Sequence, residues 1–155
     1  MNYTLLKFYI LTCFLTFISC NVKTQINPQI NKELQTEKFN IIFLIGDGMG
    51  LSQLSSAYFY GEKEPNFSRF PFVGLSKTRS GSHKITDSAA GATAFSTGKK
   101  TYNGAIGVDM DTNAVETISE ELAKNDWSIG FVSTSSITHA TPASFYSHVP
   151  SRLMQ

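Results

Sequence analysis

Cysteine is almost absent from this 155-residue chain, which restricts the chemistry available to it. The two cysteines, Cys13 and Cys20, both lie in the first twenty residues. The rest of the chain can therefore form neither a disulfide nor a thiolate metal site. Long charged runs and internal repeats are also missing, and the formal net charge is only +1. This balance gives no support for nucleic-acid binding, so any affinity for anions has to be local.

The apolar run near the N-terminus is too short to be a comfortable membrane span. Residues 1–20 carry Lys7 ahead of an apolar core, a pattern that predicts a signal peptide. The ending Phe17-Ile18-Ser19-Cys20 resembles a bacterial lipoprotein processing site, although Phe17 replaces the commoner leucine. We expect an exported protein, either periplasmic or anchored to a membrane by a lipid on Cys20. An ordinary cleaved signal is the alternative.

Residues 21–37 are rich in Asn, Gln and Lys and contain few large apolar side chains. Such a stretch cannot bury enough surface to repay the entropy of ordering it. We predict a flexible linker here, followed by one folded region over residues 38–155, a length that suits one domain or part of one.

Apolar runs alternate with helical patterns in this folded region. Runs rich in β-branched and aromatic residues at 39–45, 72–79 and 127–134 predict strands, the first of them covered on both faces. Helical patterns fall between them. The alternation predicts an α/β fold with a mainly parallel central sheet and right-handed crossovers.

Three helices are predicted, at 51–60, from Ser88 to a stop at Gly98, and at 113–124. In the third, Val115, Ile118 and Leu122 share one face. Three glutamates of that helix are expected to turn outward: Glu116, Glu120 and Glu121.

Ser88 stands at the start of the helix in a run of small residues, Ala89 to Ala94. The first N–H groups of a helix lack intrahelical partners and lie at the positive end of the macrodipole, so a phosphate group is favoured beside Ser88. The alternative is structural, because Thr86, Asp87 and Ser88 are all residue types that cap helices without any catalytic role.

Asp47 lies between glycines after the first predicted strand, at an edge where α/β sheets bind ligands. Its carboxylate is well placed to bind a metal ion. The alternative is a generic turn in which Asp47 caps the next helix. The spacing of Gly46, Gly48 and Gly50 does not match the GxGxxG nucleotide fingerprint.

Five further residues have a structural alternative. Thr141 suits an N-cap with Pro142 at the first helical position. His139 taken alone suits a solvated loop, and Arg152 taken alone suits a surface cation. The pair Lys99-Lys100 suits the C-terminus of the preceding helix better than a phosphate site.

Together and in this order, these segments resemble the alkaline phosphatase family over residues 39–152. The matching motifs are GDGMG at 46–50, TDSAAGATA at 86–94, STG at 96–98, KTYNG at 100–104, ATPA at 140–143 and HVPSR at 148–152. The resemblance implies the three-layer α/β/α sandwich of that family, of which this chain is the N-terminal portion.

The resemblance also implies residue roles in phosphate monoester hydrolysis with two zinc ions and one magnesium ion. Ser88 matches the nucleophile that becomes a phosphoserine, and also contacts zinc. Asp47 matches the carboxylate that bridges one zinc and the magnesium site, and Thr141 matches a hydroxyl ligand on the magnesium side. Arg152 matches the arginine that grips two phosphoryl oxygens. Small phosphorylated substrates and a homodimer follow from the same resemblance.

Two departures from the family pattern leave alternatives open. His139 stands where the best-known bacterial enzymes carry an aspartate near the magnesium site, so the third metal and direct ligation by His139 stay open. The family's remaining zinc ligands lie further towards the C-terminus, and neither His83 nor His148 matches them. A truncated protein without catalysis, at most a weak phosphate or metal binder, is therefore the alternative. A phosphodiesterase or sulfatase of the same superfamily is disfavoured, because those enzymes use a different nucleophile motif.

Overall fold

The structure is a computed structural model that describes residues 39–154. The chain divides into two units, Met1–Phe43 and Leu44–Gln155. The predicted signal peptide, the Cys20 lipid site and the linker over 21–37 lie outside the described residues. Within the described part, none of the helices is long and apolar enough to cross a membrane.

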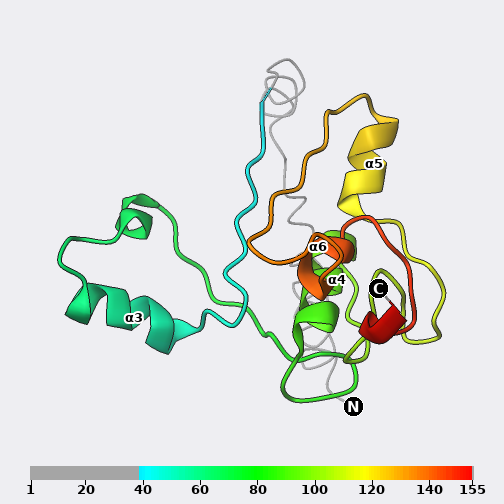
Figure 1. Cartoon of the computed structure of the whole chain (residues 1–155), viewed down its shortest axis with the longest axis horizontal. Coiled ribbons are helices and arrows are strands. Elements are labelled where there is room, and N and C mark those ends of the chain that lie inside the picture. The colour runs from blue at the N-terminus through cyan, green and yellow to red at the C-terminus, as the bar shows by residue number, and fades with distance from the viewer. Residues whose placement is uncertain (1–38, 155) are drawn as a thin grey trace, which may run out of the picture. The chain divides into compact units, whose positions relative to one another are not determined.

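The elements of the second unit are helical and joined by long irregular segments (Figure 1). They are α3 (Leu51–Tyr60), η1 (Asn66–Arg69), α4 (Ser88–Thr97), α5 (Ile118–Lys124), α6 (Ala140–Ala143) and η2 (Arg152–Met154). Within residues 39–154, two isolated backbone bridges are both antiparallel, Ile106 with Val149 and Val108 with Ala114.

Helix α3 confirms the helix predicted at 51–60. Its N-cap residue is Gly50, whose N–H donates to Gln53 Oε1 at 3.0 Å. Tyr58 packs edge-on against Phe67 of η1, with ring centroids 5.3 Å apart. This T-shaped contact fixes η1 against the last turn of α3.

Helix α4 also has the predicted bounds, because a capping residue stands at each end. Asp87 is the N-cap residue, and Gly98 closes the helix with a positive φ of 70°. Glycine reaches this left-handed conformation without the steric penalty of a Cβ atom.

The core of the unit is built where α4 meets α6 (Figure 1). Ala89 of α4 and Ala140 and Ala143 of α6 are buried together with Ile106, and Val149 packs against them. Alanine side chains allow the two helices to approach closely, so the small residues noted in the sequence form the contact surface of α4.

Buried hydroxyl groups link the same two helices. Ser96 Oγ donates to the Ser144 carbonyl at 2.6 Å. Thr93 Oγ1 lies 3.1 Å from the Ala105 carbonyl and accepts from the Gly107 N–H at 3.0 Å. Because these polar groups are buried, each bond holds α4 to its neighbours at a defined distance.

Helix α5 is shorter than the helix predicted at 113–124. Thr117 caps it in a capping box with Glu120, so the helix begins at Ile118. The preceding residues pair elsewhere, since the Asn113 N–H donates to Asp109 Oδ1. The prediction that Glu120 turns outward is wrong as well, because its carboxylate bonds His148.

The three predicted strands are absent from residues 39–154, where the segments 39–45, 72–79 and 127–134 are irregular. Their apolar side chains stay exposed: Ile42 at 84%, Phe72 at 90% and Val132 at 101%. A strand depends on paired neighbours and on a covered face, and large apolar side chains of each segment are left uncovered within residues 39–154. The parallel sheet therefore stays a prediction.

Thr93→Val should destabilise the fold by roughly 1–3 kcal/mol, because it leaves the buried Gly107 N–H and Ala105 carbonyl without their partner. Urea unfolding followed by circular dichroism measures the change. Thr97→Val is the matched control, since the Thr97 hydroxyl is only partly buried and bonds the carbonyl of Thr93 in its own helix. Equal losses in the two variants would contradict the role given to Thr93.

Candidate active site

The start of α4 separates the roles of Asp87 and Ser88. Asp87 Oδ1 accepts a hydrogen bond from the Ala90 N–H at 3.0 Å and so caps the helix. Ser88 is the first helical residue and is half-buried. Of the three capping candidates in the sequence, Asp87 is the one that caps, and the Ser88 hydroxyl is left for another contact.

That contact comes from Arg152, 64 positions along the chain. Its Nη1 donates to Ser88 Oγ at 3.1 Å and lies 3.3 Å from Asp87 Oδ2. The side chains of Arg152 and Asp87 are only 30% and 25% exposed. Arg152 is therefore not the isolated surface cation that its position near the end of the chain suggested.

The backbone that carries Arg152 is tied to the loop 102–106. Ile106 and Val149 exchange two backbone hydrogen bonds, at 3.1 and 2.9 Å. The Tyr102 hydroxyl donates to the Pro150 carbonyl at 2.7 Å, and the Arg152 N–H donates to the Gly104 carbonyl at 2.7 Å.

Asn103 braces the turn that leads into α4. Its Oδ1 accepts from the Asp87 N–H at 3.3 Å, and its Nδ2 donates to the Ile85 carbonyl at 3.1 Å. In the sequence, Asn103 was noted only as part of the KTYNG motif at 100–104. An amide that bonds a segment sixteen residues away leaves no periodic pattern that could have revealed this role.

Asp47 and Thr141 form a second polar pair. Thr141 Oγ1 donates to Asp47 Oδ2 at 2.8 Å. Asp47 does not cap α3, whose N-cap residue is Gly50. Thr141 does not cap α6, which begins at Ala140 with His139 as its N-cap residue. Neither side chain therefore caps a helix, although Asp47 does lie in the predicted turn, which the Met49 N–H closes on the Gly46 carbonyl at 3.1 Å. The two side chains bond each other instead.

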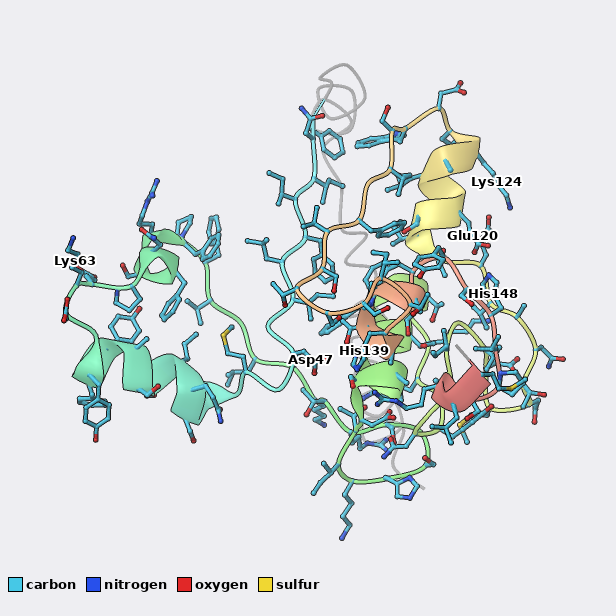
Figure 2. The ribbon with its side chains drawn as sticks, viewed as in Figure 1. Asp47, Lys63, Glu120, Lys124, His139 and His148 are labelled. Atoms are coloured by element: carbon cyan, nitrogen blue, oxygen red, sulfur yellow. The ribbon has the colours of Figure 1, made fainter. Side chains whose placement is uncertain are left out.

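His139 is half-buried at the N-cap of α6, and its side chain forms no capping hydrogen bond (Figure 2). Across residues 39–154, no three side chains of His, Cys, Asp or Glu gather closely enough to hold a metal ion. What the described residues offer is an oxygen pair, Asp47 with Thr141, and one histidine two positions from Thr141.

The core contact of α4 with α6 connects the Ser88–Arg152 pair with the Asp47–Thr141 pair. Ala89 and Ala140 are both fully buried in one cluster. Ser88 precedes the first of these residues and Thr141 follows the second. Packing of the two alanines therefore brings the starts of the two helices, and with them both hydroxyl groups, to the same part of the unit.

Lys100 takes neither of the two roles considered from the sequence. Its Nζ donates to the carbonyls of Lys77 and Arg79 and ties the segment before Ser80 to the end of α4. The interpretation of Lys100 as a partner of the helix C-terminus is wrong.

An ion pair that the sequence did not predict joins α5 to the segment that carries Arg152 (Figure 2). His148 Nε2 lies 2.9 Å from Glu120 Oε1, and its Nδ1 lies 2.6 Å from the Gly107 carbonyl. Both ring nitrogens face acceptors, so the ring makes both bonds only as the imidazolium. The side chains are 23% and 37% exposed.

The pKa values of both groups move to favour the charged pair. The hydrogen bond from His148, with others from Thr117, lowers the pKa of Glu120 to about 2. Partial burial lowers the pKa of His148, but its bonds to Glu120 and Gly107 outweigh this effect and raise it above its ordinary value.

Glu120→Gln should destabilise the protein most between about pH 4.5 and 6.5. The lowered pKa of Glu120 stabilises the fold above the pKa of the unfolded carboxyl group, and the effect is lost as the pH falls towards 2. The raised pKa of His148 stabilises the fold below about 6.5, and the effect is lost as the pH rises through the folded value. Thermal unfolding over a pH series measures the difference, which we expect to be roughly 1 kcal/mol for this partly exposed pair.

Glu121→Gln removes the same charge from an exposed position on α5 and is the control. A pH-independent difference between wild type and Glu120→Gln would contradict the ion pair.

Comparison with known proteins identifies the family. A family model described as alkaline phosphatase matches residues 38–155. The chain belongs to the alkaline phosphatase family. It is 45% identical over 121 residues to an alkaline phosphatase of Schizosaccharomyces pombe, a match that covers 74% of this chain and 23% of that relative.

Solved structures of the family share this fold. The alkaline phosphatase of the Antarctic bacterium TAB5 is 56% identical, with a TM-score of 0.68, over 70% of this chain and 32% of that one. A histidine-to-aspartate variant of it, 54% identical with the same TM-score and covering 70% and 31%, has Mg bound in its M3 site. The described structure is thus similar to solved alkaline phosphatases over the matched part, while the central sheet stays a prediction. The chain spans only about a quarter of the length of the curated relatives it matches.

Proposed function

We propose that the intact protein is a metal-dependent phosphate monoester hydrolase that acts through a phosphoserine on Ser88. The observation that supports this most strongly is the contact of the Arg152 guanidinium with Ser88 Oγ, at 3.1 Å and beside the N-terminus of α4. A guanidinium offers paired N–H donors that match the oxygens of a phosphoryl group. The end of the helix favours the same negative charge.

The reaction would consist of two displacements at phosphorus, in which Arg152 and Ser88 have different roles. Arg152 would hold two phosphoryl oxygens while Ser88 Oγ attacks phosphorus. The Oγ–P bond forms as the ester P–O bond breaks, and the alcohol departs with the electron pair and takes up a proton. Water then attacks the phosphoserine, the P–Oγ bond breaks, and inorganic phosphate leaves with Ser88 restored.

The oxygen pair of Asp47 and Thr141 fits the hard-oxygen ligand preference of magnesium. We propose that these two residues, with His139 close by on α6, hold the magnesium side of the site, and that Ser88 faces the zinc side. Two zinc ions and one magnesium ion, when bound, would favour the deprotonated hydroxyl and neutralise charge on the attacking and leaving oxygens. The related TAB5 variant has Mg bound in its M3 site, which supports a magnesium ion in this family.

Ser88→Ala should abolish formation of a covalent phosphoenzyme, because the attacking oxygen is gone. The intact protein is incubated with labelled phosphate at acidic pH, denatured and assayed for protein-bound label. Ser128→Ala, at an exposed position, is the control and should label as wild type does. Label retained by the Ser88 variant would refute the phosphoserine proposal.

Asp47→Asn should reduce bound magnesium in the purified intact protein, because it removes the ionised oxygen that faces Thr141. Elemental analysis after dialysis measures the metal content. Asp111→Asn removes a carboxylate from an exposed loop and should leave the metal content unchanged. Equal metal content in all three proteins would exclude Asp47 as a ligand.

A second candidate function concerns this 155-residue chain by itself. No three metal-binding side chains gather within residues 39–154, which favours a chain that binds phosphate or metal weakly without turnover. The chain can be expressed alone and assayed for hydrolysis of a phosphate monoester, with and without added zinc. Hydrolysis by this chain would exclude the second proposal.

We propose that the intact protein is exported, that a lipid on Cys20 anchors it to a membrane, and that it forms a homodimer. The pattern at the N-terminus supports the first two proposals, and family membership supports the third. Small phosphorylated compounds would be its substrates, since the candidate site presents groups suited to the phosphoryl oxygens.

A further inference from the structure

The Glu120–His148 ion pair lies at the start of the short segment that ends at Arg152. His148 is fixed on both sides of its ring, by the Glu120 carboxylate and by the Gly107 carbonyl. Thr117, fully buried, holds Glu120 in turn: its N–H donates to Glu120 Oε2 at 2.8 Å. The carboxylate is thereby held in the orientation that meets the ring.

Gly107 shows how closely the ring is seated. A Cβ atom at this position would lie 2.7 Å from His148 Nδ1 and 2.1 Å from the Ser147 carbonyl oxygen. The φ angle of Gly107 is 59°, which also favours glycine. The backbone at position 107 therefore lies so close to His148 that only glycine, which has no Cβ atom, fits there.

Four of the five residues from His148 to Arg152 are bonded to the loop 102–107. Val149 pairs with Ile106, Pro150 accepts from Tyr102, and the Arg152 N–H donates to Gly104, as described above. The segment is thus held at both ends, by the ion pair at His148 and by the backbone bond at Arg152.

We propose that Glu120 and His148 are positioning residues for Arg152: their ion pair anchors the segment 148–152 so that the guanidinium stays at Ser88 and binds the phosphoryl group. This inference rests on the proposed function of Arg152. Neither residue needs to touch the substrate, because the effect passes through five residues of anchored backbone. A charged pair suits this task, since its bonds are stronger and more directional than neutral ones.

A double-mutant cycle in the intact enzyme tests the proposal. Glu120→Gln should raise KM for a phosphate monoester and Ki for inorganic phosphate roughly fivefold, a change equivalent to about 1 kcal/mol, with a smaller change in kcat. In an Arg152→Ala background the same substitution should have no further effect, because the group being positioned is gone. An equal effect of Glu120→Gln in both backgrounds would overturn the proposal, since a general loss of structure acts independently of Arg152.

Two further variants complete the design. Tyr102→Phe removes only the hydroxyl bond to Pro150, at an exposed position, and should show the same dependence on Arg152 even if Glu120→Gln folds poorly. Glu121→Gln should leave KM and Ki unchanged. An effect of Tyr102→Phe that is independent of Arg152, or an effect of Glu121→Gln as large as that of Glu120→Gln, would also count against the proposal.

Hydrogen exchange separates this proposal from the proposed function. The amides of Val149 and Arg152 should exchange faster in Glu120→Gln than in Glu121→Gln. Unchanged exchange would refute the anchoring even in an active enzyme. Faster exchange in a protein that does not hydrolyse phosphate monoesters would support the anchoring while the proposed reaction fails.

Discussion

The close approach of α4 to α6 is the constraint on which the rest of the unit depends. Two buried alanines, Ala89 and Ala140, set the distance, and the bond from Ser96 Oγ to the Ser144 carbonyl, at 2.6 Å, maintains it. A larger side chain at either alanine would separate the helices, since a packed core accommodates added volume poorly. The starts of the two helices carry Ser88 and Thr141, so the packing of small residues also determines where the two hydroxyl groups lie.

Arg152 is positioned beside Ser88 by a different set of contacts. It belongs to neither helix, and the loop 102–107 supports the segment that carries it. That loop is in turn bonded to α4 through the buried hydroxyl of Thr93, which contacts Ala105 and Gly107. Helix α4 therefore fixes both the serine at its own start and, through one intermediate layer, the arginine that faces it.

The sequence correctly predicted structural features that depend only on neighbouring residues. The cap at Asp87 and the stop at Gly98 depend on neighbouring residues, and both ends of α4 agree with the structure. The capping alternative for Thr141 and the outward orientation of Glu120 were wrong, because these side chains bond partners 94 and 28 positions away, which no periodic pattern encodes. The predicted strands depend on partner strands in the same way, and apolar side chains of these segments, Ile42 and Phe72 among them, are exposed in the described region. Resemblance to the family pointed to Arg152 where physical reasoning from one residue could not.

Asp87 shows how capping and the proposed chemistry can share one side chain. One carboxylate oxygen is occupied by the Ala90 N–H, and the other faces Arg152 Nη1 at 3.3 Å. Asp87 thereby keeps the guanidinium beside Ser88. The position of the Asp87 carboxylate is itself fixed, because moving it away from the Ala90 N–H would uncap the helix. In the proposed reaction, a phosphoryl group arriving at Ser88 would bring more negative charge than the serine hydroxyl that it displaces from Arg152, so the exchange would favour the phosphoryl group. The same arrangement would hold the arginine in place before a substrate binds, with Nη1 engaged by Asp87 and Ser88 and the other N–H groups of the guanidinium directed to the phosphoryl oxygens in the proposed reaction.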